Sequence, residues 1–290
     1  MGTLITCQVH KKKPTLLLLN ALHVASTGAE VQIISPDTDV LLLALRRYPQ
    51  LGHNPSFITV VGDKRRTIFL KPMYDSIGDC LAAALPGFHA FTGCDTTGHF
   101  AGKGKQGCWK ALKKSSVNVI EAFIQLGSNR TISPEMELAL ELFVCQLYLP
   151  GTELCELSSL RWHMFKKSFA ESEKLPPTKG ALEQHIKRAH YQATVWYHDE
   201  IAKPKLPEPS EYGWTLENNL YRPVITHLPP APKAVLELVM CKCAERHVVP
   251  ASEQIVYAQR CALVRHLMTS VRTLNNQQPL IQMTVMMNYN

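Results

Sequence analysis

The stretch Ile33-Ile34-Ser35-Pro36-Asp37-Thr38-Asp39-Val40-Leu41-Leu42-Leu43 decides the fold that this sequence predicts. Its apolar start predicts a buried strand over 30–35, and the apolar residues after Asp39 predict a helix to about Tyr48. The carboxyl ends of strands in open α/β sheets are where such folds place their sites. The stretch therefore predicts two carboxylates, spaced i and i+2, at a functional edge of a sheet.

The flanking segments extend this pattern into an α/β fold, with a mostly parallel sheet flanked by helices. A helix is predicted over 14–27, where Thr27-Gly28 ends it, and two strands over 56–61 and 66–70, joined by a turn. Further helices are predicted over 74–85, 104–114, 117–126, 134–149, 156–170 and 178–200. Strands thus lie in the first ninety residues, and helices follow.

Prolines change the character of the chain after about Lys203. They stand at positions 204, 207, 209, 223, 229, 230 and 232 and exclude regular helix there. We expect an extended arm anchored by Trp214 and Tyr221. The predicted domains are an α/β domain over 1–130, a helical extension over 131–200, this arm over 201–243, and a divergent tail over 244–290.

Composition limits the possible classes of protein. The chain has 290 residues with 46% hydrophobic content, which supports a packed core, and a net charge of +7, which suits a polyanionic partner. Its nine cysteines are odd in number and scattered, which favours reduced thiols in the nucleus or cytoplasm over a disulfide framework. The run Leu16–Leu19 after three lysines is broken by Asn20, so we expect neither a secretory signal nor a membrane span.

Three aspartates are the candidate catalytic and metal-binding residues. Asp37 and Asp39 follow the predicted strand, and Asp95 follows a long apolar segment that could return it to the same edge. Neighbouring carboxylates raise one another's pKa unless a cation neutralises them, and Mg²⁺ prefers oxygen ligands. The alternative is that Asp37 or Asp95 caps a helix, since aspartate is a favoured N-cap residue.

Basic residues form the candidate nucleic-acid-binding surface. In the loop Gly102-Lys103-Gly104-Lys105, glycines would let backbone N–H groups approach a phosphate, and Lys110 extends the charge. Arg65 and Arg66 lie at the tip of the predicted hairpin. The alternative for both groups is an ordinary solvated surface.

Cys241 and Cys243, with His247 nearby, form a weak zinc signal. Structural zinc sites usually have four ligands, and this segment offers three candidates. Free or buried thiols are the alternative.

The motifs together resemble a known group of proteins. They are Ser35–Leu41, Leu85–Thr97, Gly102–Lys105 with Trp109-Lys110, Leu160–Trp162, Leu175–Thr178, His185–Trp196, Gly213-Trp214 and Leu228–Val239. Over about residues 10–243 the chain is similar to a multi-copy family of uncharacterised animal proteins. That family is in turn similar to the PIN-like domain of flap and structure-specific endonucleases.

The resemblance implies a function and a role for each motif. Asp37, Asp39 and Asp95 would bind catalytic Mg²⁺ or Mn²⁺, and the 102–105 loop with its following helix would grip a nucleic-acid backbone, DNA rather than RNA. The implied chemistry is two-metal hydrolysis of a phosphodiester, in which one metal generates the attacking hydroxide and both stabilise the pentacovalent phosphate.

Both ends of the chain depart from the family pattern. Relatives carry an acidic cluster of the form His-Glu-Glu-Ala-Asp-Thr where this chain has His10-Lys11-Lys12-Lys13-Pro14-Thr15. Lysines there would repel metal, so we expect the loss of one ion and a weakened activity, and we also expect a preceding strand to be missing. After Cys243 the sequence no longer follows the relatives' cysteine-rich segment.

Two other function classes remain open. The chain could bind nucleic acid without cleaving it, which requires only the basic surface and a steep dependence of affinity on salt. It could instead be a protein-interaction scaffold, which should be indifferent to both salt and aspartate substitution.

Overall fold

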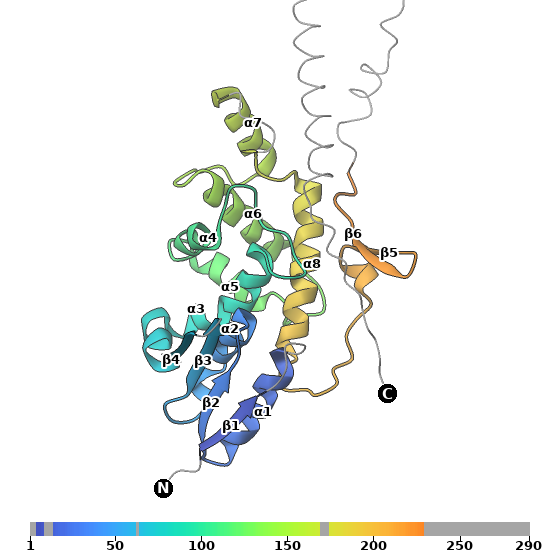
Figure 1. Cartoon of the computed structure of the whole chain (residues 1–290). Helices are drawn as coiled ribbons and strands as arrows, with labels where there is room; N and C mark the ends of the chain where they lie inside the picture. The colour runs from blue at the N-terminus through green and yellow to red at the C-terminus, as the bar shows by residue number, and fades with distance from the viewer. Residues whose placement is uncertain (1–3, 9–13, 62–63, 169–173, 229–290) are drawn as a thin grey trace, which may run out of the picture.

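A computed structural model describes residues 4–8, 14–61, 64–168 and 174–228 of the chain. The architecture is mixed α/β, with a small four-stranded sheet at one end and helices that extend away from it (Figure 1). No helix in the described residues is long and apolar enough to cross a membrane.

The sheet has the strand order β1-β2-β3-β4. Its strands are β1 (Leu4–Gln8), β2 (Glu30–Ile34), β3 (Ser56–Val61) and β4 (Lys64–Phe69). β1 pairs with β2 and β2 with β3 in parallel, and β3 pairs with β4 as an antiparallel hairpin. Gln8, Ile34 and Ile58 lie in one register row, so β1 and β2 end level with each other.

β1 corrects one expectation. The strand expected to be missing before the first helix is present, and it pairs along its whole length with β2. The strands predicted over 30–35 and 56–61 are confirmed, and β4 begins two residues before its predicted start.

Three helices follow strands of the sheet in the chain. They are α1 (Pro14–Ser26), which packs on β1 and β2, α2 (Thr38–Arg46) and α3 (Leu70–Thr92), and α2 lies against α1 and α3. The helix predicted over 74–85 is therefore longer at both ends. Its interior is broken at Gly78, whose φ of 76° and ψ of 168° are a conformation that side-chain-bearing residues avoid.

The remaining helices are close to their predicted positions. They are α4 (Lys105–Leu112), α5 (Val117–Gln125), α6 (Pro134–Tyr148), α7 (Leu157–Ser168) and α8 (Lys179–Tyr197). Side-chain caps define two of the starts, because Ser133 accepts a hydrogen bond from the Met136 amide and Thr178 from the Ala181 amide.

One hydrophobic core connects the sheet to the helices. Its members range from Leu17 to Trp196 and lie on both sides of residue 130, where the boundary between the first two domains was predicted. At its centre the rings of Phe91, Phe123 and Phe143 meet edge to face, with centroids 5.0 to 6.1 Å apart. The carboxyl-terminal turn of α3 is thus built into the hydrophobic core.

The described part of the proline-rich arm contains regular structure that the sequence pattern did not predict. A 3₁₀ turn (Pro209–Tyr212) leads into a hairpin of β5 (Trp214–Glu217) and β6 (Leu220–Pro223). Trp214 is buried, as its predicted anchoring role requires, and Arg188 of α8 donates hydrogen bonds to the carbonyls of Gly213 and Val224. Residues 229–290 lie outside the described part of the chain.

Candidate functional site

Asp37 lies at the carboxyl end of β2 and begins α2. Its Oδ1 accepts a hydrogen bond from the Asp39 amide at 2.9 Å, and its own amide donates to Ser35 Oγ at 3.1 Å. The capping alternative is therefore confirmed for Asp37. Capping uses one of the two carboxylate oxygens, and a carboxylate can accept several hydrogen bonds, so the cap leaves coordinating capacity.

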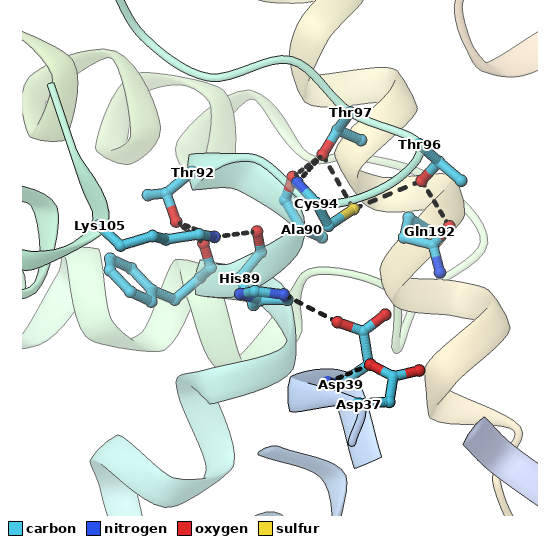
Figure 2. A network of polar contacts seen from close by, with 11 residues as sticks. Asp37, Asp39, His89, Ala90, Thr92, Cys94, Thr96, Thr97, Lys105 and Gln192 are labelled. Carbon is cyan, nitrogen blue, oxygen red and sulfur yellow. Dashed lines mark hydrogen bonds and ion pairs between the residues drawn. The ribbon is translucent and has the colours of Figure 1, made fainter. Parts of the chain in front are cut away.

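Asp39, in the first turn of α2, contacts a histidine from α3. His89 Nε2 lies 2.9 Å from Asp39 Oδ1, and these side chains are 14% and 16% exposed. The imidazole stacks on the ring of Trp196 from α8, with centroids 5.7 Å apart and planes inclined by 28°. Figure 2 shows the carboxylates of Asp37 and Asp39 side by side, with His89 reaching Asp39.

Asp95 stands on a short loop after α3 that side chains hold in place. Gly93 begins the loop at a φ of 109°, which favours glycine, and an added Cβ there would lie 3.0 Å from His99 Cβ. Thr97 Oγ1 donates to the Ala90 carbonyl at 2.5 Å, and Thr96 Oγ1 donates to Gln192 Oε1 of α8 at 2.6 Å (Figure 2). The Asp95 side chain is exposed on this tethered loop.

The three predicted aspartates act on one another electrostatically. The pKa of Asp37 is raised, chiefly by burial and further by the negative charges of Asp39 and Asp95. The Asp39 amide and His89 lower it in part. Asp37 is therefore a carboxylate whose charge the surrounding protein does not fully compensate.

The donor set fits a hard divalent cation. Mg²⁺ is commonly bound by one or two carboxylates together with water and substrate phosphates, and Asp37 and Asp39 supply two adjacent carboxylates. In the described ranges, no three side chains of histidine, cysteine, aspartate or glutamate form a group that could hold a metal. Among the described residues, Asp95 is therefore not grouped with Asp37 and Asp39 as a third metal ligand.

The ammonium of Lys105 is turned inward, toward the last turn of α3 (Figure 2). Its Nζ donates to the His89 carbonyl and to Thr92 Oγ1, both at 2.8 Å, and lies 5.9 Å from the centre of the Phe88 ring. Burial of the ammonium lowers the pKa of Lys105 to about 8, although the residue as a whole is exposed. The ammonium thus stabilises the carboxyl end of α3, where a positive charge favours the helix dipole.

The rest of the predicted basic loop leads into α4. Lys103 places its Nζ 4.8 Å from the centre of the Tyr148 ring, and burial lowers its pKa. Gly104 is the N-cap of α4, Gly102 adopts a φ of 68°, and Lys110 is exposed in the last turn of the helix. The loop therefore offers exposed backbone, with an exposed lysine beyond it.

The second predicted basic group lies elsewhere. Arg65 and Arg66 are exposed on β4, an outer strand of the sheet, where they pair with Val60 and Thr59. The predicted zinc ligands Cys241 and Cys243, and the lysines at 11–13, lie outside the described residues.

Sequence reasoning missed the partners of the carboxylates. His89, Trp196 and Gln192 belong to the motifs that carry the family resemblance, but no role was predicted for them. The sequence signal for these residues was the density of polar and aromatic residues within otherwise buried helices. In α8, for example, four such residues are buried along one run: His185, Arg188, His190 and Gln192.

Comparisons of this chain with protein-family models, with curated proteins and with solved structures found no match. The assignment of a function therefore depends on the geometry of the site and on the sequence motifs.

Proposed function

We propose that this protein is a metal-dependent nucleic-acid phosphodiesterase with a PIN-like fold, whose site comprises Asp37, Asp39 and Asp95. The observation that carries the proposal is the pair of adjacent carboxylates at the carboxyl end of β2, where Asp39 and Asp95 both raise the pKa of Asp37. Like charges gathered at the end of a buried strand destabilise a fold unless a cation neutralises them. Groups with pKa values perturbed in this way are more frequent at functional sites than elsewhere in proteins.

Each residue has a distinct part in this proposal. Asp37 and Asp39 bind Mg²⁺ or Mn²⁺, and Asp95 supplies negative charge from the tethered loop. The chemistry that a bound cation supplies is activation of water and neutralisation of charge at the scissile phosphate. Exposed Lys110 and the backbone around Gly104 bind the flanking phosphates, where the amino end of α4 favours an anion.

DNA is the proposed substrate and the nucleus or cytoplasm the proposed location. The cysteines at 80, 94, 108, 145 and 155 are free thiols, which suits a reducing compartment.

A second candidate is nucleic-acid binding without cleavage. Arg65 and Arg66 are exposed on an outer strand and, with Lys110, provide positive charge that needs none of the aspartates. Such binding depends on phosphate contacts alone and weakens steeply with salt.

A cleavage assay tests the first candidate. End-labelled single-stranded, duplex and flap DNA, and single-stranded RNA, are incubated with the full chain and Mn²⁺ or Mg²⁺. The variants are Asp39→Asn and the control Asp75→Asn, since Asp75 is exposed and paired with Lys71 on the surface of α3. We expect cleavage by the wild type and by Asp75→Asn that is lost in Asp39→Asn and in chelator.

Two results would contradict the first candidate. Cleavage that survives in Asp39→Asn would place the chemistry elsewhere or in a contaminant. No cleavage, with salt-dependent DNA binding that Asp39→Asn leaves unchanged, would support binding without hydrolysis.

A further inference from the structure

His89 makes the most specific polar contact that the proposed site contains. Its Nε2 lies 2.9 Å from Asp39 Oδ1, across fifty residues of sequence, and both side chains are largely buried. An ionised carboxylate only accepts hydrogen bonds, so the contact assigns the proton to Nε2. The bond fixes one Asp39 oxygen, and the other is turned away from the imidazole (Figure 2).

His89 is itself held at its ring and at its backbone. Trp196, 3% exposed, stacks on the ring from α8, and the Lys105 ammonium binds the His89 carbonyl from the start of α4. An aliphatic or aromatic residue could pack on Trp196 equally well. Only a residue with a donor at the Nε2 position could also orient Asp39.

We propose that His89 is a positioning residue, which holds Asp39 Oδ1 so that the second oxygen of Asp39 is presented beside Asp37 for the divalent cation. The inference rests on the proposed function, because it concerns the same carboxylates. Hydrogen-bond partners of metal ligands orient those ligands, and their loss typically costs about 10- to 100-fold in metal affinity.

The same arrangement links the basic loop to the carboxylates. Lys105 binds the His89 carbonyl and Thr92 Oγ1 at the last turn of α3, so it supports the turn that carries the imidazole. Lys105 therefore acts in this proposal as a support for His89, and Lys110 is an exposed lysine that remains for phosphate.

Calorimetric titration with Mn²⁺ tests the role of His89 without any activity assay. His89→Phe keeps a ring against Trp196 and removes the donor, whereas His89→Gln keeps an N–H donor at a similar reach. His163→Phe, at an exposed histidine of α7, is the matched control. Circular dichroism and thermal unfolding in chelator establish that each variant is folded.

We expect His89→Phe to weaken Mn²⁺ binding about 10-fold or more, with His89→Gln and His163→Phe within about 3-fold of wild type. Wild-type affinity in folded His89→Phe, or equal weakening in His89→Gln and His89→Phe, would overturn the positioning role alone. If Asp39→Asn also binds Mn²⁺ like wild type, or if the wild type binds none, the proposed function fails together with the positioning role.

Discussion

The two ends of α2 carry opposite electrostatic arrangements. At the amino end, Asp37 and Asp39 lie together, and Asp95 adds a third negative charge. At the carboxyl end, Arg46 and Arg47 meet Asp199, which follows α8 and is fully buried. Acidic residues at the start of a helix and basic residues at its end both favour the helix dipole, so this general effect does not distinguish the two ends.

At the carboxyl end Arg47 is closely compensated, whereas burial lowers the pKa of Arg46 on balance. Arg47 Nη2 lies 2.6 Å from Asp199 Oδ1 and its Nε lies 3.2 Å from both oxygens, while Arg46 Nη1 approaches to 3.6 Å. Burial alone lowers the pKa of Arg47, but Asp199 and Glu200 raise it on balance. This cluster ties α2 to the end of α8.

The amino end is not compensated in this way, since the net effect on Asp37 is a raised pKa. Arg47 at the carboxyl end thus has a partner that favours its charge, whereas the surroundings of Asp37 at the amino end disfavour its charge. We expect substitutions at the two ends of α2 to differ in size and sign.

The largest expected effect is at Asp199. Asp199→Ala leaves two arginines partly buried without their shared partner, which should lower the free energy of unfolding by about 3 to 5 kcal/mol. Urea denaturation measures this, with Asp75→Ala as a control that should cost at most about 0.5 kcal/mol because its ion pair is exposed. A loss at Asp199 below about 1 kcal/mol would contradict the stabilising role of this end.

A large loss of stability in acid is expected from the contact between α3 and α8. His185 Nε2 donates to the Phe91 carbonyl at 2.7 Å, and burial lowers the pKa of His185 to about 4 from 6.5. A lowered histidine pKa gives stability that is present above pH 6.5 and is lost as the pH falls towards 4. The loss should be about 3 kcal/mol over that range.

Urea denaturation at pH 7 and about pH 4.5 measures this loss, and His185→Gln should remove most of it. An equal loss in wild type and variant would show that another group controls the acid response.

A smaller effect is expected where the Asp95 loop meets α8. Thr96→Val removes the hydroxyl that donates to Gln192 at 2.6 Å with little change of shape. The free energy of unfolding should fall by about 1 kcal/mol, and Mn²⁺ binding should weaken if the loop holds Asp95 in place. Unchanged stability together with unchanged Mn²⁺ affinity would mean that the hydrogen bond from Thr96 to Gln192 has no effect on the carboxylates at the amino end of α2.

The smallest effect, and the one of opposite sign, is expected at Asp37. The variant Asp37→Asn should still cap α2, because asparagine is as good an N-cap as aspartate, but it removes one negative charge. A raised carboxyl pKa means that folding favours the protonated form, so the ionised group costs stability above that pKa.

In chelator at pH 7, Asp37→Asn should therefore be slightly more stable than wild type. The difference should disappear as the pH falls through the raised pKa of Asp37. Parallel urea denaturation at pH 7 and about pH 4 measures it, and a variant that is less stable at pH 7 would contradict the interpretation.

Local patterns were enough to predict much of the fold. The strand before Asp37, the helix after it and its aspartate cap depend on contacts between near neighbours, and they are confirmed. The β5–β6 hairpin was missed although Asn218 and Asn219 carry its signal. Both have positive φ, which is the geometry of a two-residue hairpin turn.

The parts that local patterns could not predict are those that depend on distant partners. β1 has no periodicity of its own and is defined by its pairing with β2, twenty-six residues along the chain. The contact of His89 with Asp39 and the inward turn of Lys105 likewise depend on how α3 packs between α2, α4 and α8. Residue type alone suggested a phosphate-binding lysine at 105, whereas packing directs its ammonium to the end of α3.

The most direct test of the central proposal is the binding of Mn²⁺ to the amino end of α2. Electron paramagnetic resonance of free Mn²⁺ is recorded during titration with wild type, Asp39→Asn and Asp75→Asn. We predict that wild type and Asp75→Asn remove the free-ion signal in a saturable way and that Asp39→Asn does so much more weakly. Equal removal by all three proteins, or none by the wild type, would contradict a cation site at these carboxylates.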